Sequence, residues 1–148
     1  MAIRVVVVDD SAFMRTIIVR LLRDDPEFEV VGYAGDGAEA VAKVGELRPD
    51  VITMDVEMPR MNGIEAVEII MRDTPTPVVM LSGVTLRGAA VTIEALAKGA
   101  IDFVTKPSGG AEADLALVKQ ELQDKLRRAA GLSPARLAAA RLASSPVP

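Results

Sequence analysis

The chain has 148 residues, of which 50% are hydrophobic and 3% aromatic, so it can bury one core built mainly from aliphatic side chains. Its net charge of −4 and its lack of cysteine argue against nucleic-acid binding and exclude disulfides and thiolate metal sites. It also has no histidine, which excludes a Ser-His-Asp triad within these residues. No apolar run reaches membrane-spanning length and no signal peptide is recognised, so we expect a cytoplasmic protein without membrane insertion.

The first predicted elements are a strand over residues 3–8 and a helix over residues 11–23. β-branched side chains fill the strand almost continuously, which is typical of a strand buried on both faces of a parallel sheet. The strand ends in Asp9-Asp10, and either Asp10 or Ser11 can cap the helix. The apolar residues at helical spacing are Phe13, Ile17 and Leu21, with Met14, Ile18 and Leu22 beside them.

Four more strand and helix patterns follow in alternation. The strands are expected at 28–34, 51–55, 78–81 and 101–105, and the helices at 38–47, 64–72, 86–98 and 112–130. This alternation predicts an α/β fold: a flavodoxin-like, doubly wound, five-stranded parallel sheet in the order 2-1-3-4-5, with five helices. Residues 1–130 would form this domain, whereas the composition of residues 131–148 indicates a linker.

Charged or hydroxyl residues stand where four of the five predicted strands end. Asp9 and Asp10 follow the first strand, Asp55 ends the third, Ser82 follows the fourth, and Lys106 follows the fifth. In a doubly wound sheet, ligands bind at the carboxyl ends of the strands beside the point where the strand order reverses. We therefore expect these side chains to converge there.

Clustered carboxylates repel one another, by about 4 kcal/mol for two charges 4 Å apart at an effective dielectric near 20. A hard cation or a lysine would relieve that repulsion, and Mg²⁺ suits oxygen ligands. An aspartate beside Mg²⁺ can act as the nucleophile in phosphoryl transfer and form an acyl phosphate. The metal and Lys106 would stabilise the phosphoryl charge, and the Ser82 hydroxyl could hydrogen-bond a phosphoryl oxygen. The pattern therefore predicts that an aspartate of this cluster can accept a phosphoryl group.

Each motif taken alone also has a purely structural explanation. Asp9-Asp10 could cap a helix, Ser82 with the glycine after it could form a turn, and Lys106 with the proline after it could lie in a surface loop. Their joint occurrence at four strand ends favours the phosphoryl-transfer site.

These motifs resemble the receiver domain of two-component response regulators, over about residues 2–130. The matching residues are Asp9-Asp10, Asp55 with Met58-Pro59 and Gly63, Ser82-Gly83, Phe103 and Lys106-Pro107. The resemblance implies Mg²⁺-dependent phosphoryl transfer from a histidine kinase to Asp55. The chain by itself would then catalyse only its own phosphorylation and dephosphorylation.

The resemblance also implies a set of metal ligands. Asp10 and Asp55 would bind Mg²⁺ directly, together with the backbone carbonyl of Glu57, and Asp9 would act through a water molecule. The Glu57 side chain, two residues past Asp55, could overhang the phosphoryl group and slow its hydrolysis. The alternative for that side chain is a solvated carboxylate in a loop.

For the other half of the site, the resemblance implies that Ser82 and Lys106 bind the phosphoryl group. Ser82 and the aromatic residue Phe103 would act as the switch that reports phosphorylation. The resemblance also predicts a cis peptide bond between Lys106 and Pro107, which would aim the lysine at the site.

Three stretches, residues 9–15, 54–59 and 102–109, resemble the chemotaxis protein-glutamate methylesterase and deamidase more closely. In that family a linker joins a receiver to a C-terminal Ser-His-Asp esterase domain. The implied partners are a chemotaxis histidine kinase, that esterase domain and, indirectly, chemoreceptors. Because the chain has no histidine, we interpret it as the regulatory half with its linker.

Two other functions are weighed against this one. A stand-alone receiver would bind a motor or adaptor protein once phosphorylated. An aspartyl-phosphate phosphatase of the haloacid-dehalogenase type also uses an aspartate and Mg²⁺. However, its nucleophile lies on the first strand with the acid two residues later, so Asp55-Val56-Glu57 on the third strand is a poor match.

Phosphorylation is expected to be read out on the surface formed by the fourth helix, the fifth strand and the fifth helix. On the fifth helix, Leu117 lies opposite the apolar stripe and is predicted to be exposed. On the fourth helix, Ile93, Leu96 and Ala97 are predicted to face the sheet, with Leu86 and Val91 partly outside that stripe.

Overall fold

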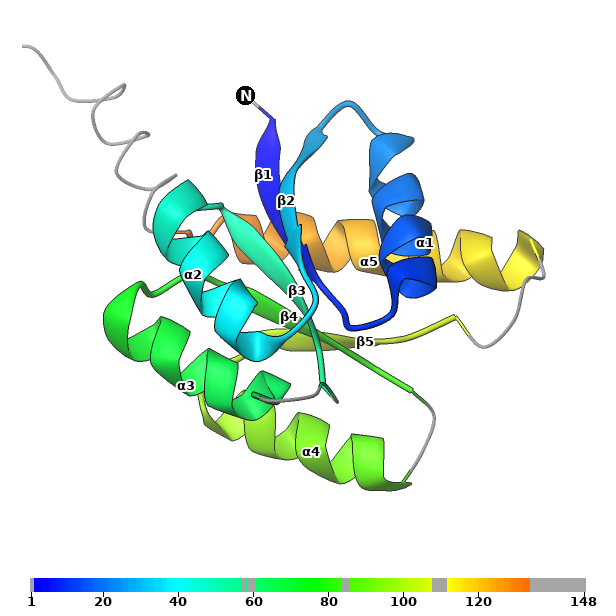
Figure 1. The fold of residues 1–148 in the computed structure, drawn as a ribbon. Helices are drawn as coiled ribbons and strands as arrows, with labels where there is room; N and C mark the ends of the chain where they lie inside the picture. The colour runs from blue at the N-terminus through cyan, green and yellow to red at the C-terminus, as the bar shows by residue number, and fades with distance from the viewer. Residues whose placement is uncertain (1, 57, 59–60, 84–85, 108–111, 134–148) are drawn as a thin grey trace, which may run out of the picture.

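The computed structural model describes residues 2–56, 58, 61–83, 86–107 and 112–133. Within these ranges five strands alternate with five helices, and the strands form one parallel sheet in the order β2-β1-β3-β4-β5 (Figure 1). The elements are β1 (Ile3–Val8), α1 (Ala12–Arg23), β2 (Phe28–Ala34), α2 (Gly37–Leu47), β3 (Val51–Asp55), α3 (Gly63–Asp73), β4 (Val78–Ser82), α4 (Leu86–Ala97), β5 (Asp102–Thr105) and α5 (Glu112–Ala130). The predicted doubly wound fold and its strand order are confirmed.

Helices cover both faces of the sheet: α1 and α5 pack on one face, and α2, α3 and α4 pack on the other (Figure 1). The first strand shows why the sequence is apolar at successive positions. Val5 and Val7 enter the core under α1 and α5, whereas Val6 and Val8 enter the core under the other helices. In the described part of the chain, no helix is long and apolar enough to cross a membrane.

Side-chain caps fix where three of the helices begin. Ser11 caps α1, its hydroxyl oxygen accepting a hydrogen bond from the Met14 backbone N–H at 3.1 Å. Asp36 and Asn62 cap α2 and α3 in the same way. Of the two cap residues that the sequence left open for α1, Ser11 occupies the position. Asp10 therefore remains available for other contacts.

Two helices expose residues that the sequence pattern placed on a buried stripe. On α1, Phe13 is 74% exposed, while Ile18 and Leu22 are fully inside the core. On α4, Ile93 is 69% exposed and Val91 packs against the core, the reverse of the prediction. The pattern is ambiguous because apolar residues occur around most of the circumference of α4.

Small side chains decide which side of α4 approaches the sheet. Thr92 and Ala95 are buried at the contact, and Ala97, which was predicted to face the sheet, is exposed. Their small volume lets the helix pack closely, so the bulkier Ile93 is directed to solvent. The side chain of Leu86 lies outside the described residues.

Gly63 marks a close contact between the start of α3 and the end of β3. A β-carbon added at Gly63 would lie 2.5 Å from the backbone oxygen of Asp55. We expect Gly63→Ala to lower the free energy of unfolding by about 1–3 kcal/mol, because the strand end must shift to make room. Urea denaturation measures the change.

The matched control is Gly45→Ala in α2, where no atom lies within 4 Å of the added carbon. This substitution should raise the free energy of unfolding by about 0.5–1 kcal/mol, because glycine is a poor helix former. Equal effects of the two substitutions would show that Gly63 is not constrained by the strand end.

Candidate functional site

The polar residues predicted at the strand ends do converge at one edge of the sheet. Asp9 and Asp10 follow β1, which pairs with β3, and Asp55 is the last residue of β3. One carboxylate oxygen from each of these three residues lies within 4.8 Å of the other two. Parallel pairing alone brings these residues together, since their positions in the chain are far apart.

The carboxylates differ in their exposure. Asp9 is fully buried and Asp55 is 3% exposed, whereas Asp10 is exposed to solvent. The Ser11 backbone N–H donates to Asp9 Oδ1 at 2.9 Å, and Arg15 Nη1 donates to the Asp9 backbone oxygen at 2.7 Å. These two hydrogen bonds fix the position of Asp9 on the buried side of the site.

Lys106 supplies the positive charge that the cluster requires. Its Nζ lies 2.8 Å from Asp55 Oδ1 and 3.2 Å from Asp9 Oδ2. Burial by itself would lower the pKa of Lys106, but its contacts with Asp55 and Asp9 outweigh burial and raise that pKa, so the ammonium form persists.

The Lys106–Pro107 peptide bond is trans, and the described residues contain no cis peptide bond. The prediction of a cis bond was therefore wrong. Trans is the ordinary isomer of a peptide bond, and here the lysine reaches Asp55 without the bend that a cis bond would supply.

The pKa of Asp55 is raised to about 7, first because the carboxyl is buried. The hydrogen bond from Lys106 opposes that rise, and the nearby charge of Asp9 adds to it. Near neutral pH, without a metal ion, Asp55 therefore binds a proton for part of the time. A divalent cation at the cluster would compete with that proton.

This raised pKa predicts how the stability of the metal-free protein depends on pH. The folded state retains a proton on Asp55 between about pH 4 and pH 7, where the unfolded state has released it, so stability falls as pH rises through that range. Asp55→Asn removes the penalty and should raise the free energy of unfolding by about 1–3 kcal/mol at pH 8 in EDTA.

Denaturation curves at pH 5 and pH 8 give the measurement, and the gain from Asp55→Asn should be smaller at pH 5. If the wild type were instead more stable at pH 8 and the variant gained nothing there, Asp55 would not be the group that limits metal-free stability.

The donor set fits a hard divalent cation such as Mg²⁺. Asp9 Oδ2 is buried and accepts no hydrogen bond from the described residues, although Lys106 faces it as an ion pair. A buried, unsatisfied carboxylate oxygen is costly, and a cation with its bound water would satisfy it. The site is built from carboxylate oxygens, which favour Mg²⁺ over softer metals. Glu57, the source of the predicted carbonyl ligand, lies outside the described residues.

Ser82 and Phe103, the proposed switch residues, occupy different environments. Ser82 is buried at the end of β4, and its backbone oxygen accepts a hydrogen bond from the Lys106 N–H at 2.8 Å. Phe103 on β5 is 42% exposed, so its ring lies at the surface. Phosphorylation would have to move this ring if it acts as the switch.

Lys125 on α5 is a contact of Phe103 that sequence reasoning missed. Its Nζ lies 5.0 Å from the centre of the Phe103 ring and donates to the Phe103 backbone oxygen at 2.7 Å. Both contacts hold the exposed position of the ring. The only sequence signal was the helical pair Glu121–Lys125, whose ion pair measures 2.9 Å.

The sequence profile of the response regulator receiver domain matches residues 5–127. The chain belongs to the response regulator receiver family. Membership confirms the predicted two-component signalling class and leaves the haloacid-dehalogenase type of phosphatase without support.

Curated relatives show which proteins with a receiver domain the chain resembles. The chain is 54% identical over 132 residues to a protein-glutamate methylesterase/protein-glutamine glutaminase of Thermotoga maritima, and 52% identical over 128 residues to one of Pyrococcus abyssi. Those alignments cover 89% and 86% of this chain but only 38% and 35% of the relatives. The chain therefore spans well under half the length of these relatives.

Solved structures agree with the profile. The response regulator domain of CheB from Thermotoga maritima superposes with a TM-score of 0.80 at 53% identity, covering 90% of this receiver and all of that domain. A signal receiver domain from Mycobacterium tuberculosis gives a TM-score of 0.71 at 31% identity, covering 85% of this chain and 97% of that one. The predicted fold and the predicted resemblance to the methylesterase receiver are both confirmed.

Proposed function

We propose that the chain is the phosphoryl-acceptor domain of a chemotaxis protein-glutamate methylesterase, and that Asp55 accepts the phosphoryl group from a histidine kinase. The observation that carries this proposal is the pairing of a buried Asp55 with Lys106 at 2.8 Å inside a cluster of three carboxylates. Relatives at about half identity carry the methylesterase name, which supports the choice of enzyme.

In the proposed reaction, one carboxylate oxygen of Asp55 attacks phosphorus while the bond between phosphorus and the donor nitrogen breaks. The products are an acyl phosphate and a free imidazole on the kinase. Bound Mg²⁺, held by Asp9, Asp10 and Asp55, would supply charge neutralisation for the phosphoryl oxygens.

The residues of this chain perform the remaining tasks. Lys106 lies beside the nucleophile and can follow the charge onto the phosphoryl oxygens. Ser82, at the end of the neighbouring strand, can donate its hydroxyl to one of those oxygens. Since only the deprotonated Asp55 attacks, its raised pKa predicts slower reaction below about pH 7 unless the metal displaces the proton.

Removal of the metal tests this proposal. With Mg²⁺ and acetyl phosphate, we expect intact-protein mass spectrometry to show one added phosphoryl group, and with EDTA in place of Mg²⁺ we expect at least a tenfold lower yield. An equal yield with and without Mg²⁺ would contradict the role of the carboxylate cluster as a metal site.

In the same proposal, the face formed by α4, β5 and α5 regulates the esterase domain. Ile93, Phe103 and Leu117 lie on these three elements and are 69%, 42% and 71% exposed. Such a group of exposed apolar residues is a candidate for covering another protein surface. The exposure of Leu117 agrees with the prediction from its helical position. Residues 131–148 would link this domain to the esterase.

A further inference from the structure

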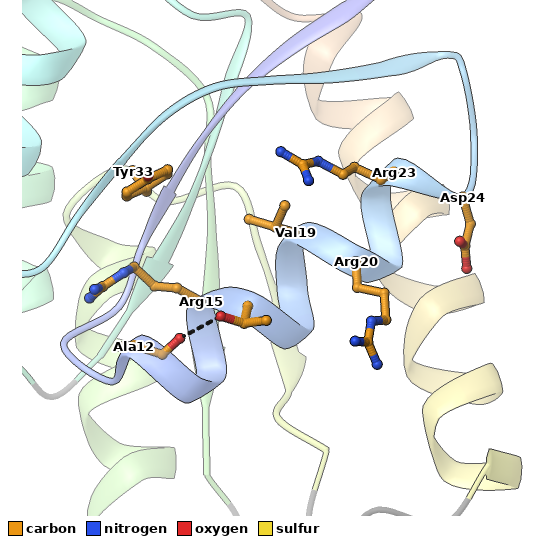
Figure 2. A pocket seen from close by; sticks show the side chains of 8 residues that line it. Ala12, Arg15, Val19, Arg20, Arg23, Asp24 and Tyr33 are labelled. Atoms are coloured by element: carbon orange, nitrogen blue, oxygen red, sulfur yellow. Dashed lines mark hydrogen bonds between the residues drawn. The ribbon is translucent and has the colours of Figure 1, made fainter.

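A groove of about 510 Å³ lies along the outer side of α1, next to the edge strand β2 (Figure 2). Its volume is within the range of ligand pockets, roughly 300–1,000 Å³. Arg15, Arg20 and Arg23 line it together with Val19 and Tyr33. Its lining contains none of the three clustered carboxylates and no residue of α4, β5 or α5, although Arg15 also donates to the Asp9 backbone oxygen.

Two of these arginines have no partner among the described residues. Arg20 and Arg23 are exposed and form no hydrogen bond or ion pair with any residue in the described part of the chain. The one acidic residue in the lining, Asp24, already pairs with Lys119 at 3.2 Å. In a chain of net charge −4, these guanidinium groups form a local positive surface.

The apolar part of the groove lies between the charges. Figure 2 shows Arg15 and Arg23 both reaching from α1 toward the side where Tyr33 lies, with Val19 between them. Tyr33 is 60% exposed, and the Arg15 guanidinium carbon lies 6.0 Å from the centre of its ring. A ligand that fits this lining carries negative groups at its two ends and an apolar group in the middle.

The spacing of the charges indicates the size of that ligand. Arg15 and Arg23 are eight residues apart on one helix, a rise of about 12 Å at 1.5 Å per residue. A single phosphate is too small to reach both side chains. Carboxylates two turns apart on a partner helix have the same spacing.

We propose that this groove binds an acidic amphipathic segment of a partner protein. Its carboxylates pair with Arg15 and Arg23, Arg20 adds positive charge beside them, and an apolar side chain packs between Val19 and Tyr33. The chain's own residues 131–148 are not the occupant, because they contain arginine and no acidic residue. The proposal is independent of the proposed function, since it uses neither Asp55 nor Lys106.

The test uses Tyr33, which is the only tyrosine of the chain, as the reporter. The protein is labelled with 3-fluorotyrosine and titrated with a helical peptide in which Glu pairs two turns apart flank Leu residues. We expect a saturable change of the fluorine resonance that weakens with added salt. The double variant Arg20→Glu/Arg23→Glu should weaken binding at least tenfold, by about 1.4 kcal/mol.

Three controls make the result decisive. Lys43→Glu makes the same kind of charge change on α2 and should leave binding unchanged. A peptide with Gln in place of Glu should not bind. Arg15 stays unmodified throughout because it also holds the backbone of Asp9. Thermal melting by circular dichroism confirms that the double variant is folded, as expected for two exposed positions.

The proposal is overturned if the peptide causes no resonance change at millimolar concentration, or if the folded double variant binds as well as the wild type. It is also overturned if inorganic pyrophosphate or single-stranded DNA binds as tightly as the peptide, because the groove would then recognise negative charge alone.

Discussion

Asp55→Asn is expected to abolish phosphorylation by acetyl phosphate in the presence of Mg²⁺, with no modified protein detected by mass spectrometry. The amide that replaces the carboxylate is not a nucleophile of comparable strength. It also removes one of the three carboxylates that would hold the metal. The expected loss is therefore larger than for removal of a group that only binds the phosphoryl oxygens.

Asp50→Asn is the matched control for this experiment. Asp50 is also a buried aspartate, 6% exposed, but it accepts a hydrogen bond from the Arg4 backbone N–H at 2.8 Å before β3 begins, at the opposite edge of the sheet. This variant should be modified to the same extent as the wild type. Equal modification of the wild type and Asp55→Asn would show that another residue is the acceptor.

On the proposed function, Leu117→Asp in an enzyme that joins this chain to an esterase domain is expected to raise the basal esterase activity about fivefold or more without phosphorylation. If Leu117 packs against the esterase domain, burying a new carboxylate there costs at least about 1 kcal/mol, and the inhibitory contact weakens by that amount. Ile93→Asp should act in the same direction, because Ile93 is also exposed on the face formed by α4, β5 and α5. The rate of methyl-ester hydrolysis by that enzyme measures both effects.

The choice of Ile93 follows from the structure. Val91, which the sequence pattern placed toward the surface, packs against the core, so Val91→Asp would report on folding rather than on the interface. Ala42→Asp, at an exposed position of α2, introduces the same charge away from the proposed face and serves as the control. Unchanged basal activity in both test variants, with full stimulation by phosphorylation retained, would exclude this face as the inhibitory interface.

The positions of the catalytic candidates follow largely from the sequence. Continuous β-branched runs predict buried parallel strands, and a parallel sheet brings the ends of its strands to one edge. Asp9, Asp55 and Lys106 therefore had to approach one another once the strand order was fixed. Their identification required no knowledge of side-chain packing, because the chain direction alone determines which edge each residue reaches.

The rotation of the helices and the contacts of the surface side chains were decided only by the tertiary structure. Phe13 and Ile93 fit apolar helical patterns but are exposed, because other residues of the same helices pack more closely on the sheet. Lys125 meets Phe103 from 22 residues away, a separation at which no local pattern operates.

The groove beside α1 also depended on tertiary structure. Arg15, Arg20 and Arg23 were visible in the sequence only as polar positions of a helix. Their common groove with Tyr33 exists because β1 pairs with β2 in parallel and places the edge strand beside α1. The sequence by itself determined the fold and the strand-end cluster, since both follow from backbone periodicity. Packing between distant segments determined which side chains remain free at the surface to meet a partner.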